Sequence, residues 1–316
     1  MTGALFAFAL GLVILLVAAR FFTGAAERLG LALGLSPFVV GVFIVAIGTS
    51  LPELVASLVS VRAGTSEIVS GNVLGANAAN LLLILGAVSV AVPAGRINLG
   101  EQYLFIDLHF LLGATLAMVT AMSDGRVTPV EGALLLLAYA VYVAYLLAEG
   151  RTETANAAQA ANLSTPRRRH ARDLLVLLAS GAAIYVGGER TVAGLSQLAV
   201  ALGIAPAIAS VTILSIGTTL PELAVSITAA RRGLASLAVG NILGSCIFNA
   251  LVVCGAASLA GGVEVPAAIR TFALPFVAAA SLLFYLLTQD KRVSRWEGLL
   301  FLVLFFLFMT KMAGIG

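Results

Sequence analysis

Long apolar stretches recur along the whole chain and are separated by short polar segments. Each is about 20 residues long, enough for one helix to cross a hydrocarbon layer of roughly 30 Å. The stretches are continuously apolar, so they predict helices and not the alternating strands of a membrane barrel. The predicted fold is an all-α membrane protein with ten transmembrane helices. The spans are 4–22, 33–61, 68–92, 101–122, 129–148, 173–190, 205–230, 236–260, 267–288 and 295–313.

Composition and charge placement support this interpretation. Hydrophobic residues make up 60% of the chain and charged residues 10%, whereas an ordinary soluble domain is about a quarter charged. Thirteen of the 18 Lys and Arg residues fall near one set of helix ends, which predicts that both termini lie outside. We therefore expect a multi-pass protein of a cell inner membrane or plasma membrane, surrounded by lipid, functional as a monomer and without a nucleic-acid partner.

A repeated motif divides the chain. Residues 48–54 read GTSLPEL and residues 217–223 read GTTLPEL, an offset of 169 residues. The same offset relates GNVLGANAAN at 71–80 to GNILGSCIFN at 240–249, and Pro37 to Pro206. Because this offset spans five helices, the second copy is predicted to lie upside down relative to the first, as in transporters built from inverted repeats.

The predicted organisation therefore has three parts. Residues 1–148 form the first repeat with helices 1–5, and residues 173–316 form the second, inverted repeat with helices 6–10. Residues 149–172 are expected to be a cytoplasmic linker, partly flexible, because they are polar, rich in Ala and Asn and end in a basic run.

Two glutamates are candidates for the functional centre. Glu53 and Glu222 lie deep within the second and seventh spans, where a charged carboxylate costs several kcal/mol unless it is paired, protonated or bound to a cation. A single such residue could be a structural carboxylate bonded to a neighbouring helix. Two at equivalent positions of a repeat favour a cation site at mid-membrane.

Hydroxyl residues precede each glutamate by four and three positions, and therefore project from the same helix face. They are Thr49 and Ser50 before Glu53, and Thr218 and Thr219 before Glu222.

Each motif also contains a proline one residue before the glutamate. Pro52 and Pro221 lack an amide proton, which frees the carbonyl oxygens of Gly48 and Gly217 and loosens the helix. Exposed carbonyl oxygens are ligands for hard cations.

Asparagines on the following helices complete the candidate site. Asn80 and Asn249 each lie 27 residues after the glutamate of their own repeat. Closely packed helices would bring them near the carboxylates, and two GxxxG steps predict such packing. These steps are formed by Gly71, Gly75, Gly240 and Gly244.

This oxygen-rich set fits calcium, which takes six to eight oxygen ligands. Two carboxylates and two freed carbonyls would supply about six oxygens, whereas thiol- or imidazole-preferring metals are disfavoured. The two histidines, His109 and His170, belong to no recognisable catalytic arrangement. An intramembrane enzyme is therefore not indicated, and no cofactor is expected apart from the transported ions.

The paired motifs resemble the two alpha repeats of the sodium/calcium exchanger family, within the calcium/cation antiporter superfamily. The resemblance implies a core of helices 2, 3, 7 and 8, with helices 1 and 6 sliding across it. It implies that Glu53, Glu222 and the backbone oxygens of Thr49 and Thr218 hold calcium. It also implies sodium-site residues, namely Ser50, Thr219, Ser245, Ala46 and Ser215, with Asn80 and Asn249 lining the centre.

The chain departs from this family pattern at two positions. Relatives often have serine where this chain has Ala76, and loss of that hydroxyl should weaken an outer sodium site. Some relatives, including potassium-dependent exchangers, have aspartate where this chain has Asn249. The centre is then left with two formal negative charges, and potassium should not be required.

The predicted function is secondary active exchange of calcium for sodium by alternating access. Three other readings follow from the same residues. A proton/calcium antiporter would replace sodium loading by protonation of Glu53 and Glu222. A passive channel is compatible with the composition but is not favoured by broken inverted repeats, and a purely structural role has little support.

Overall fold

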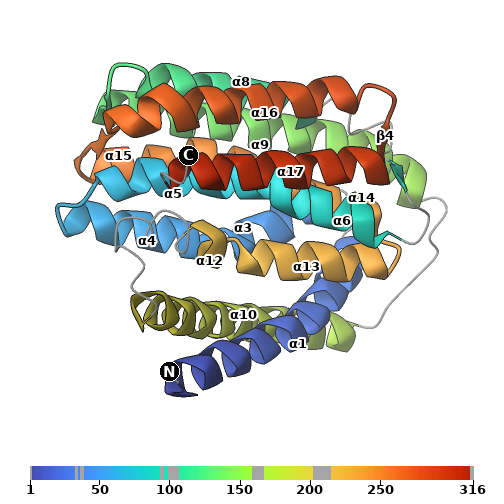
Figure 1. The fold of residues 1–316 in the computed structure, drawn as a ribbon. Helices are drawn as coiled ribbons and strands as arrows, with labels where there is room; N and C mark the ends of the chain where they lie inside the picture. The colour runs from blue at the N-terminus through green and yellow to red at the C-terminus, as the bar shows by residue number, and fades with distance from the viewer. Residues whose placement is uncertain are drawn as a thin grey trace.

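The computed structural model describes residues 2–32, 35, 39–92, 96–98, 107–158, 167–201 and 215–313. The helices run lengthwise in one bundle, and α1 (Thr2–Ala32) packs extensively against α10 (Arg167–Ala201) on one side of it (Figure 1). The remaining helices form a thicker body. In this body α5 (Glu67–Ala78) and α14 (Ala235–Phe248) are buried along almost their whole length.

The remaining helices of the first repeat are η1 (Val40–Val45), α3 (Ala46–Thr49), α4 (Leu51–Arg62), η2 (Ala79–Ile84), α6 (Leu85–Ala91), α8 (Asp107–Met122) and α9 (Pro129–Ala158). Those of the second are α12 (Ser215–Thr218), α13 (Leu220–Arg231), η4 (Asn249–Val253), α15 (Cys254–Gly261), η5 (Ile269–Ala273), α16 (Leu274–Leu287) and α17 (Arg295–Met312). The elements labelled η are wider, π-helical turns within otherwise continuous helices.

The prediction of a mostly helical membrane protein is confirmed, since helices cover most of the described residues in the predicted apolar stretches. Among the described residues, five helices are long and apolar enough to cross a membrane by length and composition alone. One further span is bent by 41° where Val40–Thr49 meets Leu51–Arg62. That bend lies at the first GTSLPEL motif, as the proline predicts.

Several boundaries differ from the predicted ones. Helix α1 continues to Ala32, beyond the predicted end at 22, and α10 continues to Ala201, beyond 190. Helices α9 and α10 also extend into the segment 149–172 that was expected to be a loop. The predicted spans stop close to Arg20 and at Glu189 and Arg190, but charged residues do not end a helix, and both helices continue through them.

Some predicted features lie outside the described residues. These are parts of the predicted spans, at 33–34, 36–38, 101–106 and 205–214, the aligned prolines Pro37 and Pro206, and residues 159–166 of the linker.

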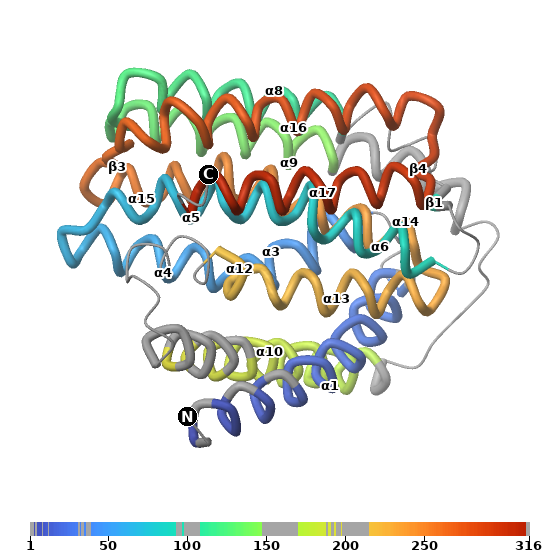
Figure 2. Tube along the Cα trace, viewed as in Figure 1, coloured from blue at the N-terminus to red at the C-terminus, as the bar shows by residue number. Residues whose placement is uncertain are grey.

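The two repeats are inverted in the structure. The equivalent helices α4 and α13 run in opposite directions, as do the α5–α6 and α14–α15 helices (Figure 1). Two short antiparallel ribbons tie the repeats together. Strand β1 (Arg96–Asn98) pairs with β4 (Arg292–Ser294), and β2 (Arg126–Val127) pairs with β3 (Val263–Glu264). The ribbons lie at opposite ends of the bundle (Figure 2), as an inverted pair requires.

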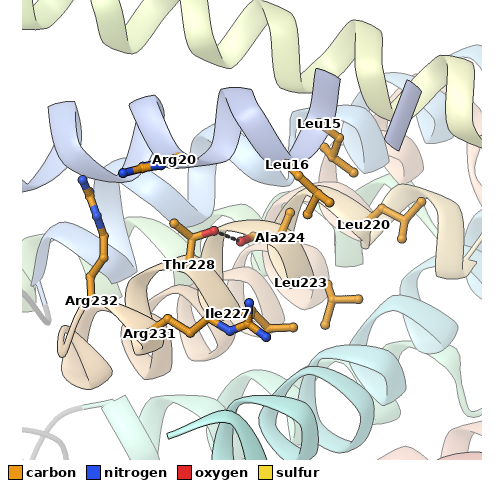
Figure 3. Close-up of a pocket in the computed structure, with 10 residues that line it drawn as sticks. All are labelled: Leu15, Leu16, Arg20, Leu220, Leu223, Ala224, Ile227, Thr228, Arg231 and Arg232. Atoms are coloured by element: carbon orange, nitrogen blue, oxygen red, sulfur yellow. Dashed lines mark hydrogen bonds between the residues drawn. The ribbon is translucent and has the colours of Figure 1, made fainter. Parts of the chain in front are cut away.

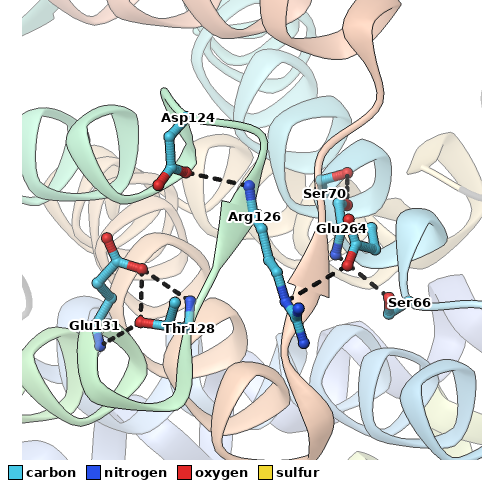
Figure 4. A network of polar contacts seen from close by, with 7 residues as sticks. All are labelled: Ser66, Ser70, Asp124, Arg126, Thr128, Glu131 and Glu264. Atoms are coloured by element: carbon cyan, nitrogen blue, oxygen red, sulfur yellow. Dashed lines mark hydrogen bonds and ion pairs between the residues drawn. The ribbon is translucent and has the colours of Figure 1, made fainter.

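Helices α9 and α17 begin with equivalent caps. The Thr128 amide and hydroxyl both lie 2.8 Å from Glu131 Oε2, and Ser294 and Glu297 form the same reciprocal box at the start of α17. Figure 4 shows the first cap beside the β2–β3 ribbon, where Arg126 pairs with the exposed Glu264 at 3.5 Å. These S/T-x-x-E patterns are structural signals that fix where helices start.

Close helix crossings repeat in the same way. A Cβ on Gly86 of α6 would lie 2.8 Å from the Gly298 oxygen of α17, and a Cβ on Gly132 of α9 would lie 2.7 Å from the Gly255 oxygen of α15. Neither distance leaves room for a side chain, so each repeat docks onto the last helix of the other through a glycine pair.

The ends of the bundle differ in charge, which gives a topology prediction. Both termini lie toward the end with the β2–β3 ribbon, while α13 and the β1–β4 ribbon end at the other, arginine-rich side (Figure 2). We expect alkaline phosphatase fused to the C-terminus to be active outside the membrane, and the same reporter inserted within 159–166 to be inactive. The reverse pattern would show that the chain is oriented the other way.

Candidate functional site

The second and seventh spans break at equivalent residues. Ser50 has φ −89° and ψ 5°, and Thr219 has φ −86° and ψ 0°, so both leave regular helix geometry for one residue. Each is followed by Leu-Pro-Glu, and the proline occupies the first turn of the new helix, where its missing amide proton costs nothing. Glu53 and Glu222 are thereby held in the first turns of α4 and α13.

The sequences from Ser50 to Glu53 and from Thr219 to Glu222 match the capping-box pattern S/T-x-x-E. Neither forms the cap, however, and neither Ser50 nor Thr219 makes a side-chain capping bond. The reason lies in the backbone. The Ser50 amide already donates to the Ala46 oxygen at 3.0 Å, and the Thr219 amide donates to the Ser215 oxygen at 3.3 Å.

Each glutamate therefore has no cap amide to accept from, and its carboxylate faces the protein interior. Both side chains are fully buried, at 0% exposure. Their position in the first helical turn favours negative charge, because the helix dipole is positive there. The break thus leaves a buried carboxylate in each repeat without its usual local partner.

The carboxylates are contacted mainly from the opposite repeat. Ser50 Oγ donates to Glu222 Oε1 at 2.9 Å, and Thr49 also lies close enough to Glu222 to interact electrostatically. In the equivalent arrangement, the Thr218 hydroxyl lies near Glu53. The two carboxylates also interact with each other, so the repeats share one centre.

A second layer of reciprocal contacts holds the threonines. Thr49 Oγ1 lies 3.3 Å from Asn241 Oδ1, and Thr218 Oγ1 lies 3.3 Å from Asn72 Oδ1. Asn241 additionally donates to Ser226 Oγ at 2.8 Å. Each asparagine thus fixes the broken helix of the other repeat.

The glycines at 75 and 244 let these helices approach. A Cβ on Gly75 would lie 2.7 Å from Ser215 Cβ, and one on Gly244 would lie 2.7 Å from Ala46 Cβ. The predicted close packing is confirmed at these two positions. At Gly71 it is wrong, because a Cβ there would make only an ordinary contact at 3.7 Å.

Asn80 and Asn249 lie in the π-helical turns η2 and η4. Such turns rotate side chains out of the normal helical register and are frequent at functional sites. Both amides are fully buried, and neither their oxygen nor their nitrogen has a hydrogen-bond partner in the part of the chain that the structure describes.

Unpartnered buried polar atoms are concentrated in and between the repeated motifs of each half. Eleven such side-chain atoms occur among the described residues, all between 53 and 80 or between 222 and 249. They include both oxygens of Glu53, Glu222 Oε2 and Ser245 Oγ. Native proteins rarely leave such groups unpaired, because each costs about 1–3 kcal/mol. Their concentration in these two segments marks the candidate binding site.

The remaining predicted residues have local roles in addition. The backbone oxygens of Ala46 and Ser215 accept the Ser50 and Thr219 amides, and a carbonyl keeps a second lone pair for a cation. Thr219 Oγ1 donates within its own helix to the Ser215 oxygen at 2.9 Å. Its equivalent, Ser50, instead reaches across to Glu222, so the two halves are not identical.

Sequence reasoning missed three residues of this centre. Asn72 and Asn241 follow the first glycine of each GN block, and Asn77 donates to the Cys246 oxygen at 3.3 Å. Asn77 and Cys246 are equivalent positions in the two repeats, so their contact lies at the pseudo-two-fold axis. The available signal was that asparagine occurs in both copies of the GN block within apolar helices.

Other ionisable residues of the helices, Glu131, His109 and Glu189, lie outside the candidate site. Glu131 is occupied by the α9 cap. His109 is exposed, with its ring 6.0 Å from that of Tyr285, and Glu189 is exposed on α10. Among the described residues no cluster of three His, Cys, Asp or Glu side chains occurs, so the candidate ligands are two carboxylates with neutral oxygen groups.

Two inverted repeats, each broken at a buried glutamate and completed by the other, define the class of inverted-repeat membrane transporters. The sequence profile of the sodium/calcium exchanger protein family matches residues 3–148 and 173–313. The chain therefore belongs to the sodium/calcium exchanger family, and the resemblance noted from the motifs is confirmed.

Individual relatives agree over nearly the whole chain. The sodium/calcium exchanger MaX1 of Methanosarcina acetivorans is 30% identical over 95% of this chain and 96% of its own length. The putative antiporter CaxA of Alkalimonas amylolytica is 31% identical over 93% of this chain and 94% of its own. A solved structure of the sodium-calcium exchanger NCX_Mj superposes with a TM-score of 0.82 at 28% identity, covering 96% of both chains.

The reciprocal asparagines give a stability prediction. Asn241→Ala removes a bond from Thr49 and leaves Ser226 without its donor, so we expect it to destabilise the protein by about 2–3 kcal/mol. Asn72→Ala removes only the equivalent bond to Thr218, because the Asn72 side-chain nitrogen has no partner among the described residues. This variant should be destabilised by about 1 kcal/mol. Thermal unfolding in the same detergent measures the stability of both variants. Equal losses of stability would contradict the difference in hydrogen bonding between the two asparagines.

Proposed function

We propose that this protein exchanges calcium for sodium across the membrane by alternating access. The observation that carries the proposal is the pair of buried carboxylates, Glu53 and Glu222, left uncapped at two broken helices and surrounded by unpartnered oxygen groups. The sodium/calcium exchange named for MaX1 and NCX_Mj supports extending the same activity to this chain.

Calcium is the proposed cargo because it prefers hard oxygen ligands and tolerates irregular geometry. The carboxylates of Glu53 and Glu222 and the backbone oxygens of Thr49 and Thr218 are its proposed ligands, with Asn80 and Asn249 lining the centre. Magnesium demands near-ideal octahedral geometry and gives up water reluctantly, which fits a neutral, amide-rich lining less well.

Sodium is proposed to use the hydroxyl and carbonyl groups beside the same carboxylates. The proposed residues are Ser50, Thr219, Ser245, Ala46 and Ser215. The repeats differ in hydroxyl content at two of these positions, because Ser215 corresponds to Ala46 and Ser245 corresponds to Ala76. The second difference removes a hydroxyl at Ala76 that the family pattern often has. Ala76 and Ser245 are both fully buried, so no solvent-facing group replaces the missing hydroxyl, and a sodium site on that side should be weaker.

Electrostatics supplies the coupling. With both glutamates ionised, the centre carries two negative charges in a low-dielectric setting, where their repulsion is strong. One calcium ion or a set of sodium ions neutralises this charge. A loaded centre can therefore pass between inward- and outward-open states at lower cost than an unloaded one, which makes exchange obligatory.

The proposed moving part is the α1–α10 pair. These helices pack on each other along their length and meet the broken-helix core mainly through α13 (Figure 1). Sliding of this pair would expose one face of the centre and then the other, while the interlocked core stays intact.

A proton/calcium antiporter is the second candidate, and one observation favours it. Ala76 removes a hydroxyl oxygen from the predicted sodium lining, whereas the two interacting carboxylates remain complete. Protonation of Glu53 and Glu222 would then replace sodium loading. Potassium is not proposed as a co-substrate, because Asn249 adds no negative charge.

The carboxylates provide the first functional test. In proteoliposomes we expect Glu53→Gln and Glu222→Gln each to abolish calcium-dependent exchange, since each removes one of the two charges that calcium must balance. Glu264→Gln is the matched control, because Glu264 is exposed and its pair with Arg126 is a surface contact. Robust exchange in both centre variants would refute the assignment of the site.

The coupling ion provides the second test. Calcium uptake should follow an imposed sodium gradient at constant pH, and should need neither a proton gradient nor potassium. Ala76→Ser restores the hydroxyl that Ser245 has in the other repeat, so we expect it to lower the sodium concentration for half-maximal exchange. Uptake that follows only the proton gradient would establish the second candidate instead.

A further inference from the structure

A groove of about 490 Å³ lies between α1 and α13, and neither Glu53 nor Glu222 lines it. Its walls are apolar along most of its length, and leucines from both helices form them (Figure 3). Leu16 is 49% exposed, so the groove opens toward the surroundings of the bundle. The apolar lining is Leu15, Leu16, Leu220, Leu223, Ala224 and Ile227.

Three arginines line this groove. The side-chain ends of Arg20, from α1, and Arg232, from the end of α13, lie at the same end, whereas that of Arg231 extends back beside Ile227 (Figure 3). In the part of the chain that the structure describes, none of the three forms an ion pair, whereas nearby Arg28 pairs with Asp173 at 2.8 Å. The only hydroxyl in the lining, on Thr228, donates to the Ala224 oxygen of its own helix at 2.7 Å.

Arg232, at the end of α13, reaches across to α1. A Cβ on Gly24 would lie 2.9 Å from Arg232 Nη1 and 3.3 Å from Arg28 Nη1. Cationic groups from two different helices are therefore brought together where α1 passes α13. Asp173 balances the charge of Arg28, whereas no carboxylate among the described residues forms an ion pair with Arg232.

The cluster breaks the symmetry of the two repeats. At the offset of 169 residues, Arg20 corresponds to Glu189, Arg231 to Arg62 and Arg232 to Ala63. The equivalent positions in the other repeat thus carry no net charge, against three positive charges here. The fold itself does not require this cluster, since the inverted copy is built without it.

General rules for arginine placement account for only part of this arginine cluster. Arg231 lies in the last turn of α13, where a cation complements the helix dipole. Arg20 lies twelve residues before the end of α1 at Ala32, far from either end of its own helix. Its place beside Arg232 (Figure 3) needs a different reason.

We propose that this groove binds one anionic phospholipid, with the phosphate between Arg20 and Arg232 and an acyl chain along the leucines. Guanidinium groups bind phosphate through paired, charge-assisted hydrogen bonds. The arginine-rich side is the one that the charge distribution predicts to be cytoplasmic, where anionic lipids attract basic residues. The bound phosphate would neutralise the facing charges and join α1 to α13.

Lipid retention by the purified protein tests this proposal. Wild-type protein in neutral detergent is titrated with phosphatidylglycerol or phosphatidylcholine, and bound lipid is counted by native mass spectrometry. We expect one phosphatidylglycerol to be retained in preference to phosphatidylcholine. Arg20→Gln and Arg232→Gln should each raise the concentration for half-occupancy about fivefold, the effect of one basic residue near an anionic lipid surface.

Arg62→Gln is the matched control, because Arg62 ends α4, the inverted-repeat equivalent of α13, and lies outside the groove. It should bind phosphatidylglycerol as the wild type does. Ile227→Trp fills the apolar part while keeping every arginine, and should also weaken lipid binding. Equal retention of both lipids, or equal loss in Arg62→Gln and Arg232→Gln, would overturn the proposal.

A free anion is distinguished in the same experiment. Inorganic phosphate added alone should neither stay bound nor displace phosphatidylglycerol at matched concentration, because it gains nothing from the apolar wall. Displacement by phosphate, together with unchanged lipid binding in Ile227→Trp, would show a simple anion site and reject the lipid.

Discussion

The architecture of the candidate site depends on two backbone amides that already donate hydrogen bonds within their own helices. Because the Ser50 and Thr219 amides donate to oxygens four residues earlier, the glutamates that follow cannot form the caps their sequence suggests. The same pattern at Thr128–Glu131 and Ser294–Glu297 does form caps and only starts helices. Each broken helix is nearly continuous, with a single irregular residue. A sequence pattern that usually caps a helix therefore leaves a buried carboxylate without a capping partner.

Neither repeat can satisfy this carboxylate alone, and this explains how the halves are joined. Ser50 bonds to Glu222, Thr49 lies against Asn241, and Thr218 lies against Asn72. Each contact crosses from one repeat to the other. The glycine contacts at Ser215 and Ala46 bring the same helices close enough for these bonds. The centre is therefore a property of the interlocked pair, and a displacement of one repeat would disturb ligands contributed by both.

The sequence predicted the helical fold, the inversion and the two glutamates, because an exact offset and continuous apolar spans are local signals. It could not predict which residues meet. The offset identifies Thr49 and Thr218 as equivalent, whereas the bonds join Thr49 to Asn241 and Thr218 to Asn72, which depend on helix packing. The predicted ends of α1 and α10 were also wrong, since the predicted spans stop near the charged residues Arg20, Glu189 and Arg190, whereas both helices continue through them. Asn77 and Cys246 meet only because both approach the pseudo-two-fold axis.

Departures from symmetry carry as much information as the symmetry. The carboxylates, the threonines and the asparagines at 72, 80, 241 and 249 are duplicated, so they belong to the part of the cycle that both membrane faces share. Ala76 opposite Ser245, and Arg20 opposite Glu189, are not duplicated. A device with two identical halves would present the same centre and the same flank to each side. These unequal positions are therefore where the two open states must differ, in ion affinity at the first pair and in surroundings at the second.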